Sequence, residues 1–429
     1  MTTTDRGRPL VRPGFLKGSI VAFALLIPVV AYTVWGYVET RRLNAAIAAI
    51  VRNGEPVSEP YRRLTGQAAE ADRTYRAAAT LAEGLFSDMP TAFFSRLGEA
   101  EREGVFPPDV ASRMRELTDR YRESVTLAER AAALPFEGFA PGASGRAFGF
   151  LNSGLASLVR LLGLEAAVRA FDGDGAGAAN ALYAEGLIEK ESQFFARARL
   201  ATDLRIAAEH VRLPAAGLAR LEGVLASLDV DERPKREWQR FRAEVLRQFQ
   251  LTRASSPVIG YRVVPPWFAH ELNQDLDIFA KLVTAADGPW PGRIDRVVAI
   301  GEWPSRLGGS RTDLRALLNE DMVRHAQDLA IVRSMRLVVA IERHRRAHGE
   351  KSPARLEDMV PEYLTALPID PFSGKPLIMA AEANGYVVYS VGANRRDEGG
   401  GDVNAGFASA TAWPRGLYTN DSGIRIRYR

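Results

Sequence analysis

The chain has 429 residues, of which 46% are hydrophobic and 25% are charged, so it is long enough for two or three domains and too apolar to be broadly disordered. Its 56 Lys and Arg residues are nearly balanced by 52 Asp and Glu residues, and the net charge is only +4. This balance, without a block of basic residues, argues against a nucleic-acid-binding protein. Cysteine is absent, which excludes disulfides, thiolate zinc sites and cysteine nucleophiles.

The first element in chain order is an uncharged segment at 19–38, with the sequence SIVAFALLIPVVAYTVWGYV. A helix of this length is about 30 Å long, which matches the hydrocarbon core of a bilayer. Tyr32, Trp35 and Tyr37 cluster at its far end, as aromatic residues do at a membrane interface. The segment is longer than the apolar core of a signal peptide, and no small-residue cleavage motif follows it. We therefore predict one uncleaved transmembrane helix rather than a buried core helix.

The charges on either side of this segment predict its orientation. More basic residues precede the segment than follow it, so the positive-inside rule places residues 1–18 in the cytoplasm as a short tail. Because no second long apolar run occurs, the rest of the chain is expected on the other side. The sequence thus predicts a protein of the bacterial inner membrane, bound to lipid through its anchor, with most of the chain in the periplasm. The basic residues are Arg6, Arg8, Arg12 and Lys17 before the segment and Arg41, Arg42 and Arg52 after it.

Residues 39–311 are expected to form a large helical region. Apolar residues recur there at helical spacing, Arg and Glu fill the outer faces, and no alternating strand pattern occurs. The Gly- and Pro-rich stretch 134–145 is the expected boundary between two subdomains. The stretch 255–274, with two consecutive prolines, is expected to be a linker. Paired carboxylates are found only in segments that resemble solvated helices.

The sequence DGDG at 172–175 lies between two Ala-rich apolar segments. It is similar to the start of an EF-hand calcium loop, but Ala176 and Tyr183 stand where that loop needs its fifth- and twelfth-position ligands. A tight turn between two helices is the preferred interpretation. The segment resembles one helical hairpin of the tetratricopeptide type, with small residues at the close-packed crossing, namely Ala178, Ala179 and Ala181.

The C-terminal region, 312–429, has a different character. A long helix is expected over 312–348, followed by two strands at 375–381 and 385–391 that the turn at 383–385 joins into a hairpin. The predicted fold class is therefore mainly α: one N-terminal transmembrane helix, a large helical region, and a small C-terminal α+β module with an antiparallel sheet.

Two histidines, His344 and His348, lie four residues apart near the end of the expected long helix, a spacing with which some zinc enzymes bind their metal. Arg345 stands where such an enzyme has its general base, and a second arginine follows it, so a solvated helix end is the preferred interpretation. No nucleophile elbow, phosphate-binding loop or dinucleotide fingerprint occurs. No catalytic residue and no organic cofactor are predicted.

The stretch after the second strand, GANRRDEGGGD, is the candidate metal loop. Its oxygen-bearing side chains and its glycines are what a calcium ion needs, because calcium takes several oxygen ligands from a flexible loop. The alternative is a polar loop that closes the sheet, in which the acids balance Arg395 and Arg396. The predicted metal ligands are Asn394, Asp397, Glu398 and Asp402.

Three features in this region resemble the C-terminal part of type II secretion major pseudopilins. AHGEKSP (347–353) follows the long helix, DPFSGKP (370–376) precedes the sheet, and YVVYSVG (386–392) leads into the acidic loop. The resemblance covers about 75 to 85 residues, and it implies a pseudopilin-like sheet module whose loop binds calcium. The chain departs from the pattern at Asn394, where the family commonly has Asp, and at Arg395, where it has Gly.

The N-terminus does not match a pilus subunit, since Ser19 stands where a prepilin has Glu. The rest of the chain resembles membrane-anchored helical proteins of bacteria. The expected function is that of a single-pass, extracytoplasmic interaction or scaffold protein with protein partners in the cell envelope, linked to type II secretion or pilus-like assembly. The alternatives are a membrane-anchored, hydrolase-like enzyme with a site in the helical region, or a purely structural protein.

Overall fold

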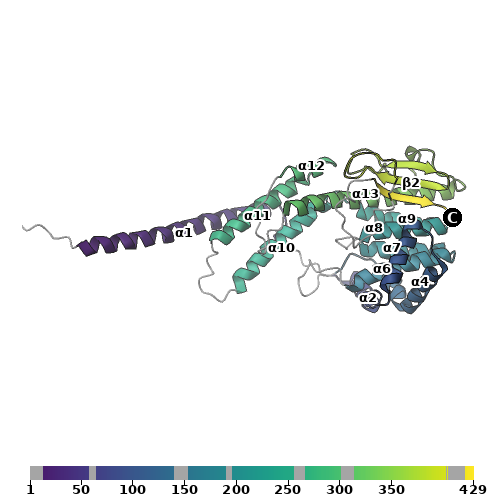
Figure 1. Cartoon of the computed structure of the whole chain (residues 1–429), viewed down its shortest axis with the longest axis horizontal. Helices are drawn as coiled ribbons and strands as arrows, with labels where there is room; N and C mark the ends of the chain where they lie inside the picture. The colour runs from purple at the N-terminus through teal and green to yellow at the C-terminus, as the bar shows by residue number, and fades with distance from the viewer. Residues whose placement is uncertain are drawn as a thin grey trace, which may run out of the picture. The chain divides into compact units, whose positions relative to one another are not determined.

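A computed structural model of the chain describes residues 13–57, 64–139, 153–189, 196–255, 266–300, 314–401, 403 and 421–429. These residues form a mainly helical fold with one small antiparallel sheet, as the sequence predicted (Figure 1). The described part contains thirteen α-helices: α1 Pro13–Arg52, α2 Gly66–Ala82, α3 Thr91–Glu103, α4 Pro108–Arg120, α5 Arg122–Ala132, α6 Ser153–Phe171, α7 Gly175–Glu189, α8 Ala196–His210, α9 Ala215–Leu228, α10 Arg233–Ser255, α11 Pro266–Ala285, α12 Gly292–Val298 and α13 Leu314–Ala347.

The chain divides into two compact units. The first takes its described residues from Met1–Pro60, Lys235–Ala286 and Ile300–Ala316. In this unit α1 packs along α11, and the two helices share a small apolar core with α10 that includes Leu43, Leu246 and Leu272. The prediction of a linker at 255–274 is therefore partly wrong, because α11 already begins at Pro266. Proline suits the first residue of a helix, where the missing N–H has no partner to lose.

The helix α1 contains the segment that was predicted to span a membrane. Its side chains are described from Leu26 onward. Among the described residues, no helix combines the length and the apolar character that crossing a bilayer requires. The side chains of residues 19–25, at the start of the predicted span, lie outside the described part of the chain.

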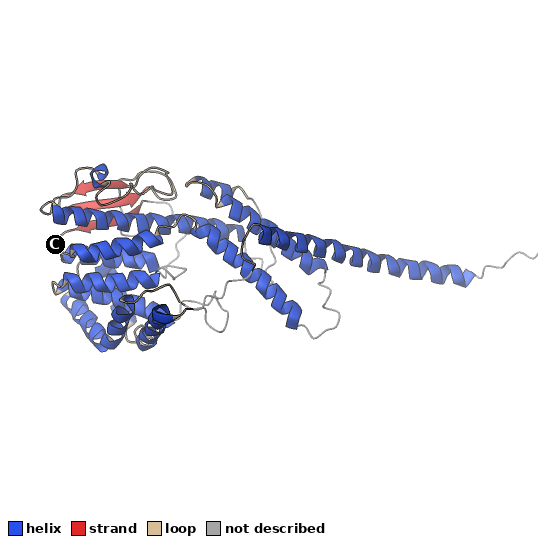
Figure 2. Ribbon diagram, turned by 180° about the vertical axis from the view of Figure 1, so that it is seen from behind, coloured by secondary structure: helices blue, strands red, loops and turns tan. Residues whose placement is uncertain are grey.

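The second unit takes its described residues from Tyr61–Pro234, Asp287–Ala299 and Leu317–Arg429. Within it, α13 runs between the sheet on one side and the layered helices α6 to α9 on the other (Figure 2). Because both sides of α13 are covered, its middle carries apolar residues all round. The five consecutive apolar residues 337–341 are each at most 1% exposed.

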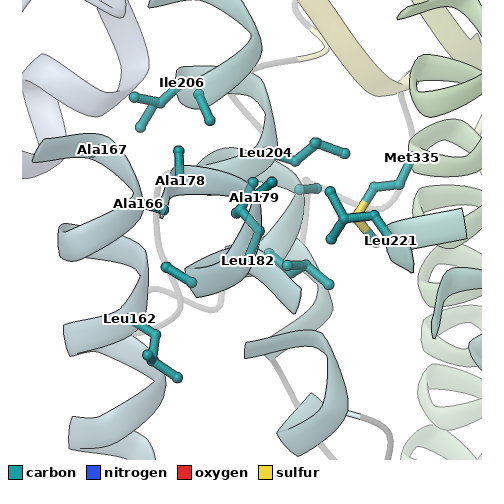
Figure 3. Packing of buried hydrophobic residues seen from close by; sticks show 14 of the residues in the cluster. Leu162, Ala166, Ala167, Ala178, Ala179, Leu182, Leu204, Ile206, Leu221 and Met335 are labelled. Atoms are coloured by element: carbon teal, nitrogen blue, oxygen red, sulfur yellow. The ribbon is translucent and has the colours of Figure 1, made fainter. Parts of the chain in front are cut away.

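The core of the second unit lies where α6, α7, α8 and α9 meet α13 (Figure 3). The helices α6 and α7 are apolar on all faces, which is typical of helices at the centre of a bundle. Ala178 and Ala181 of α7 are fully buried and Ala179 nearly so, so small residues do lie at the close helix contact that the sequence predicted.

The DGDG sequence forms the turn between α6 and α7, as predicted. Asp174 precedes the first residue of α7, and its Oδ1 accepts a hydrogen bond of 2.8 Å from the backbone N–H of Gly177. An Asp in this position caps the helix because it satisfies one of the free N–H groups of the first turn. Asp172 forms an ion pair of 2.7 Å with Arg115. Both carboxylates therefore have structural partners.

The sheet has the strand order β1-β2-β3, with β1 at Ile378–Glu382, β2 at Gly385–Ser390 and β3 at Ser422–Arg427. The hairpin of β1 and β2 was predicted; the third strand was not. Side chains of β2 alternate between two faces. Tyr386 and Val388 join the main core on the helix side, whereas Val387 and Tyr389 pack against Val403 on the outer side.

Candidate functional site

The DPFSGKP turn is fixed to the sheet by one buried carboxylate. Asp370 is 1% exposed, and its Oδ1 accepts hydrogen bonds from the backbone N–H of Phe372 (2.9 Å) and the hydroxyl of Ser390 (2.7 Å). Its Oδ2 accepts hydrogen bonds from the Ser373 hydroxyl (2.8 Å) and the Val391 N–H (3.3 Å). Since Ser390 ends β2, this single carboxylate joins the turn, the central strand and the start of the acidic loop.

The acidic loop folds back over the outer face of the sheet. At Gly400, which has a positive φ of 68°, a Cβ atom would lie 2.9 Å from the Tyr389 ring, so only glycine fits here without displacing the ring. The Tyr389 hydroxyl donates a hydrogen bond of 2.9 Å to Oδ1 of Asp397. The loop therefore lies against β2 instead of projecting from it.

Three of the four predicted metal ligands are described, and each one is held by hydrogen bonds within the loop. Besides Tyr389, the Asp397 carboxylate accepts a bond of 2.8 Å from the N–H of Gly399. The Asn394 side chain donates to Glu398 Oε1 (2.5 Å) and accepts a bond from the N–H of Arg396 (2.9 Å). The fourth predicted ligand, Asp402, lies outside the described residues.

The guanidinium group of Arg425 lies at the acidic loop, where the sequence predicted a metal ion. Arg425 of β3 donates hydrogen bonds to the carbonyl oxygens of Gly400 and Gly401 and pairs with Glu382 at 2.8 Å. The glycine carbonyls thus face a positive charge that belongs to the chain itself. Arg395, which counted against a metal in the sequence, pairs with Asp295 at 2.6 Å.

Asp421 is the important acidic residue that sequence reasoning missed. It is 7% exposed, and its Oδ2 accepts hydrogen bonds from the N–H groups of Glu398 (3.0 Å) and Gly400 (2.7 Å). Its Oδ1 is buried and accepts no hydrogen bond from any described residue. Burial raises the pKa of Asp421, and the nearby carboxylates of Glu398 and Asp397 raise it further.

The fit of the loop to a calcium ion is partial. In favour of the ion, Oδ1 of Asp421 is buried and has no hydrogen-bond partner among the described residues, and two other carboxylates lie nearby. Against it, the Arg425 guanidinium already binds two loop carbonyls, and within the described part of the chain no three acidic or histidine residues are arranged as a metal-binding group. The residues that the structure describes hold the loop closed by their own bonds.

A second group of charges lies inside the helical core of the second unit. Glu101 of α3 accepts hydrogen bonds from Arg160 of α6 (2.7 Å) and from Arg199 of α8 (2.6 and 2.8 Å). Burial by itself would raise the pKa of Glu101, but the two guanidinium groups lower it to about 2. Arg199 also pairs with Asp203 one turn further along α8, so the group forms a buried ionic network.

Glu185 of α7 lies beside this network, where Arg199 attracts it but, among the described residues, no cation forms an ion pair with it. It is fully buried, and neither carboxylate oxygen accepts a hydrogen bond from a described residue. Burial, together with the negative charges of Asp203 and Glu189, raises the pKa of Glu185 well above its ordinary value of 4.5. At Gly163 of α6 a Cβ atom would lie 2.1 Å from Asp203, so this glycine makes room for the acid.

The expectation that paired carboxylates lie only on solvated helices is therefore wrong for α7 and α8. The signal in the sequence was the apolar character of α7 on every face, which leaves its glutamates no outer surface. Which carboxylates meet inside the bundle depends on the packing of α7 against α8, and the spacing of residues along one helix does not contain that information.

No protein-family model, no curated protein and no solved structure matches this chain.

Proposed function

We propose that this protein is a single-pass, membrane-anchored interaction or scaffold protein. In this proposal α1 inserts into the bacterial inner membrane, and the bulk of the chain lies in the periplasm, where the C-terminal sheet module contacts protein partners of a type II secretion or pilus-like assembly. The lipid bilayer is the first partner, and proteins of the cell envelope are the others.

The observation that carries the proposal is the apolar surface of α1. Nine large apolar or aromatic side chains between positions 26 and 38 are exposed to solvent in the isolated chain. A soluble protein rarely leaves such a continuous patch uncovered, because burying apolar surface stabilises it by about 25 cal/mol per Å². A bilayer would cover these residues: Leu26, Ile27, Val29, Val30, Tyr32, Val34, Trp35, Tyr37 and Val38.

The change in burial along α1 supports the same boundary. After Val38, Glu39 is 3% exposed and accepts hydrogen bonds from Asn273 (2.9 Å) and His270 (3.2 Å) of α11. Leu43 and Ile50 are then buried in the core of the first unit. The helix therefore passes from an uncovered apolar part to a part that packs within the protein, as an anchor that continues into a folded domain does.

The secretion link is supported by the order of elements in the C-terminal module. A long helix, the DPFSGKP turn, an antiparallel sheet and an acidic loop follow one another in the order that the resemblance implies. Asp370 and Ser390, from the two resembling motifs, are hydrogen-bonded to each other at 2.7 Å. The module offers a partner the strand β1, which pairs with β2 on one side and with no other strand of the described part of the chain.

Membrane insertion predicts a specific effect of charge within α1. We expect the full chain to sediment with membranes and to resist extraction at high pH. Val30→Arg should move a large share of it into the soluble fraction, because an arginine at the centre of a span costs about 2.5 to 3.5 kcal/mol. The measurement is quantitative immunoblotting of membrane and soluble fractions from the native host.

Val51→Arg is the matched control, because Val51 is equally exposed on α1 but lies beyond the predicted span. This variant should stay in the membrane fraction. A full chain that is soluble without detergent, or two variants that behave alike, would refute the anchor. Protease added to spheroplasts should digest the region after residue 40, and its protection would refute the periplasmic location instead.

Calcium binding by the acidic loop is part of the proposal, and Asp421 is the observation in its favour. We expect millimolar calcium to raise the melting temperature of the full chain, since an ion near Asp421 would pair with a buried oxygen that has no partner among the residues the structure describes. Asp421→Asn and Asp402→Ala should each remove the shift. Asp295→Asn removes an acid that pairs with Arg395 and lies outside the loop, and it should keep the shift. Differential scanning calorimetry with calcium, magnesium and chelator decides the matter, and an unchanged wild-type transition contradicts calcium binding.

A hydrolase-like enzyme is the second candidate function, and Glu185 is the observation that favours it. A buried carboxyl with a raised pKa beside a second carboxylate is a common arrangement in acid–base catalysis. A buried carboxyl with a raised pKa lowers the free energy of unfolding at neutral pH, and a catalytic role would explain why the chain contains one. Whether Glu185 lowers stability is tested by the pH dependence of the free energy of unfolding of Glu185→Gln and wild type.

A further inference from the structure

The start of α11 carries an exposed tryptophan that the proposed anchor does not use. Trp267 is the second residue of α11 and is 51% exposed. Its ring packs edge-on against Phe268 at 5.7 Å, and Phe268 stacks on Phe249 of α10 at 5.6 Å. Phe249 belongs to the apolar core of the first unit. The Trp267 ring is thus supported from the core, while much of the residue remains uncovered.

Contacts between α1 and α11 place Trp267 near the end of the predicted span. A Cβ atom at Gly36 would lie 3.1 Å from Cγ of Pro266, so α1 and the first residue of α11 are in close contact. Farther along both helices, Asn273 donates a hydrogen bond of 2.9 Å to the carboxylate of Glu39. These contacts advance in the same direction, so α11 runs parallel to α1 and away from the span. Trp267 therefore lies close to the level of Gly36, in the last turn of the predicted span.

The helix α10 runs back toward this level from the opposite direction. Phe241 of α10 contacts Phe279 of α11, with ring centroids 5.4 Å apart. Phe249 contacts Phe268 near the start of α11, so the two helices are antiparallel. Beyond Phe249, α10 continues to Ser255, about 9 Å farther along its axis. The end of α10 and the start of α11 therefore lie at the end of the first unit from which the predicted span leaves.

Aromatic and basic side chains of α1 mark the same level. Trp35 and Tyr37 are exposed, and the Arg41 guanidinium lies 5.5 Å from the centroid of the Tyr37 ring. The side chain of Arg42 is 66% exposed. Tryptophan and tyrosine favour the boundary between hydrocarbon and headgroups, and arginines just outside a span attract the negative phosphates of lipids. Trp267 therefore lies at the level of residues whose chemistry suits the headgroup layer of a membrane.

We propose that the start of α11 is a second membrane contact, in which Trp267 inserts into the headgroup layer beside the anchor helix. This contact rests on the proposed membrane anchor, because a spanning α1 is what brings this end of the first unit to a bilayer. It goes beyond the anchor, because two elements instead of one then hold the first unit at the membrane surface. The partner is the phosphate-bearing headgroup layer at the C-terminal end of the span, where Arg41 and Arg42 supply the opposite charge.

A nitroxide label on single introduced cysteines tests this contact. The chain contains no cysteine, so each variant carries one label at a known position. The full chain is reconstituted in vesicles of phosphatidylethanolamine and phosphatidylglycerol, and collisions of the label with oxygen and with a water-soluble nickel chelate give its depth. Trp267→Cys should lie at headgroup depth, between Val30→Cys at the centre of the span and Val51→Cys in water. Val51 is the matched control, because it is similarly exposed (56%) on α1 and lies about 20 Å beyond Gly36.

The outcomes separate this contact from the anchor itself. If the Val30→Cys label lies in hydrocarbon and the Trp267→Cys label is as accessible to the chelate as that of Val51→Cys, the anchor stands and the contact is refuted. If the Val30→Cys label also reaches water, the anchor is refuted and the contact with it. Protection of the Trp267→Cys label from both oxygen and the chelate would show that protein covers this position instead of lipid, which would also overturn the proposal.

Tryptophan fluorescence provides a second test that leaves the site unlabelled. Lipids brominated near their headgroups should quench part of the emission of the wild-type chain in vesicles, and Trp267→Phe should lower the amount of emission that they quench. Trp238→Phe is the control, because Trp238 is 4% exposed and lies near the start of α10, away from the span. It should leave that amount unchanged. Equal amounts of quenched emission in wild type and Trp267→Phe would contradict the insertion of Trp267.

Discussion

Asp370→Asn is expected to lower the free energy of unfolding of the second unit by about 3 kcal/mol, because a buried charge-assisted hydrogen-bond network loses its acceptor. The carboxylate accepts four hydrogen bonds, two of them from backbone N–H groups that cannot turn away, those of Phe372 and Val391. An asparagine of the same shape provides one oxygen for these donors and directs an NH₂ group at the others. The measurement is chemical denaturation of the full chain, followed by tryptophan fluorescence.

Glu382→Gln is the matched control for this carboxylate, because Glu382 is a partly exposed acid of the same module whose partner, Arg425, keeps its bonds to the loop carbonyls. Its expected effect is below about 1 kcal/mol, as for other partly exposed ion pairs. Equal effects of the two variants would show that the Asp370 network does not stabilise the module more than an ordinary surface pair does.

Glu185→Gln is expected to remove a loss of stability that the wild-type protein suffers as the pH rises. The pKa of Glu185 is raised in the folded state by burial and by Asp203 and Glu189, whereas in the unfolded chain it returns to about 4.5. Below pH 4.5 both states hold the proton. Above pH 4.5 the unfolded state releases it first, so the folded state binds more protons and the free energy of unfolding falls.

This fall continues, at up to about 1.4 kcal/mol per pH unit, until the pH passes the folded-state pKa. The difference in stability between Glu185→Gln and wild type should therefore grow steadily in favour of the variant from pH 5 upward. Urea denaturation at several pH values measures it. Glu123→Gln removes an exposed acid of α5 and controls for the change in net charge. A difference that does not change with pH would contradict a raised pKa of the Glu185 carboxyl in the folded core.

The helical elements and the hairpin followed from local patterns in the sequence. The limits of α13 agree with the predicted helix to within two residues at its start and one at its end, because continuous apolar periodicity and a glycine after the last turn determine a helix locally. The DGDG turn was interpreted correctly for a similar reason, since Asp174 caps a helix whose start was evident. The linker at 255–274 was partly wrong because two prolines also suit the first turn of a helix.

The candidate site was predicted less completely than the fold. Sequence spacing identified the acidic loop but not Asp421 or Arg425. Asp421 lies just before the third strand and Arg425 lies within it, and this strand, which follows the loop in the chain, pairs with β2. A strand of six residues with alternating arginines carries little signal in the sequence. Only the pairing of that strand shows that an arginine contacts the loop carbonyls.

The sequence by itself determined the mainly helical character, the long helix followed by the β1–β2 hairpin, the apolar segment near the N-terminus and the DPFSGKP turn, because each depends on residues that are close together in the chain. The tertiary structure decided which charges are buried and which partner each one has. Glu185 meets Asp203 from another helix, and the carbonyls of Gly400 and Gly401 meet Arg425 from another strand. The interaction between two charges depends on their distance in space. Charges that are far apart in the chain come close enough to interact only when their helices and strands pack against one another.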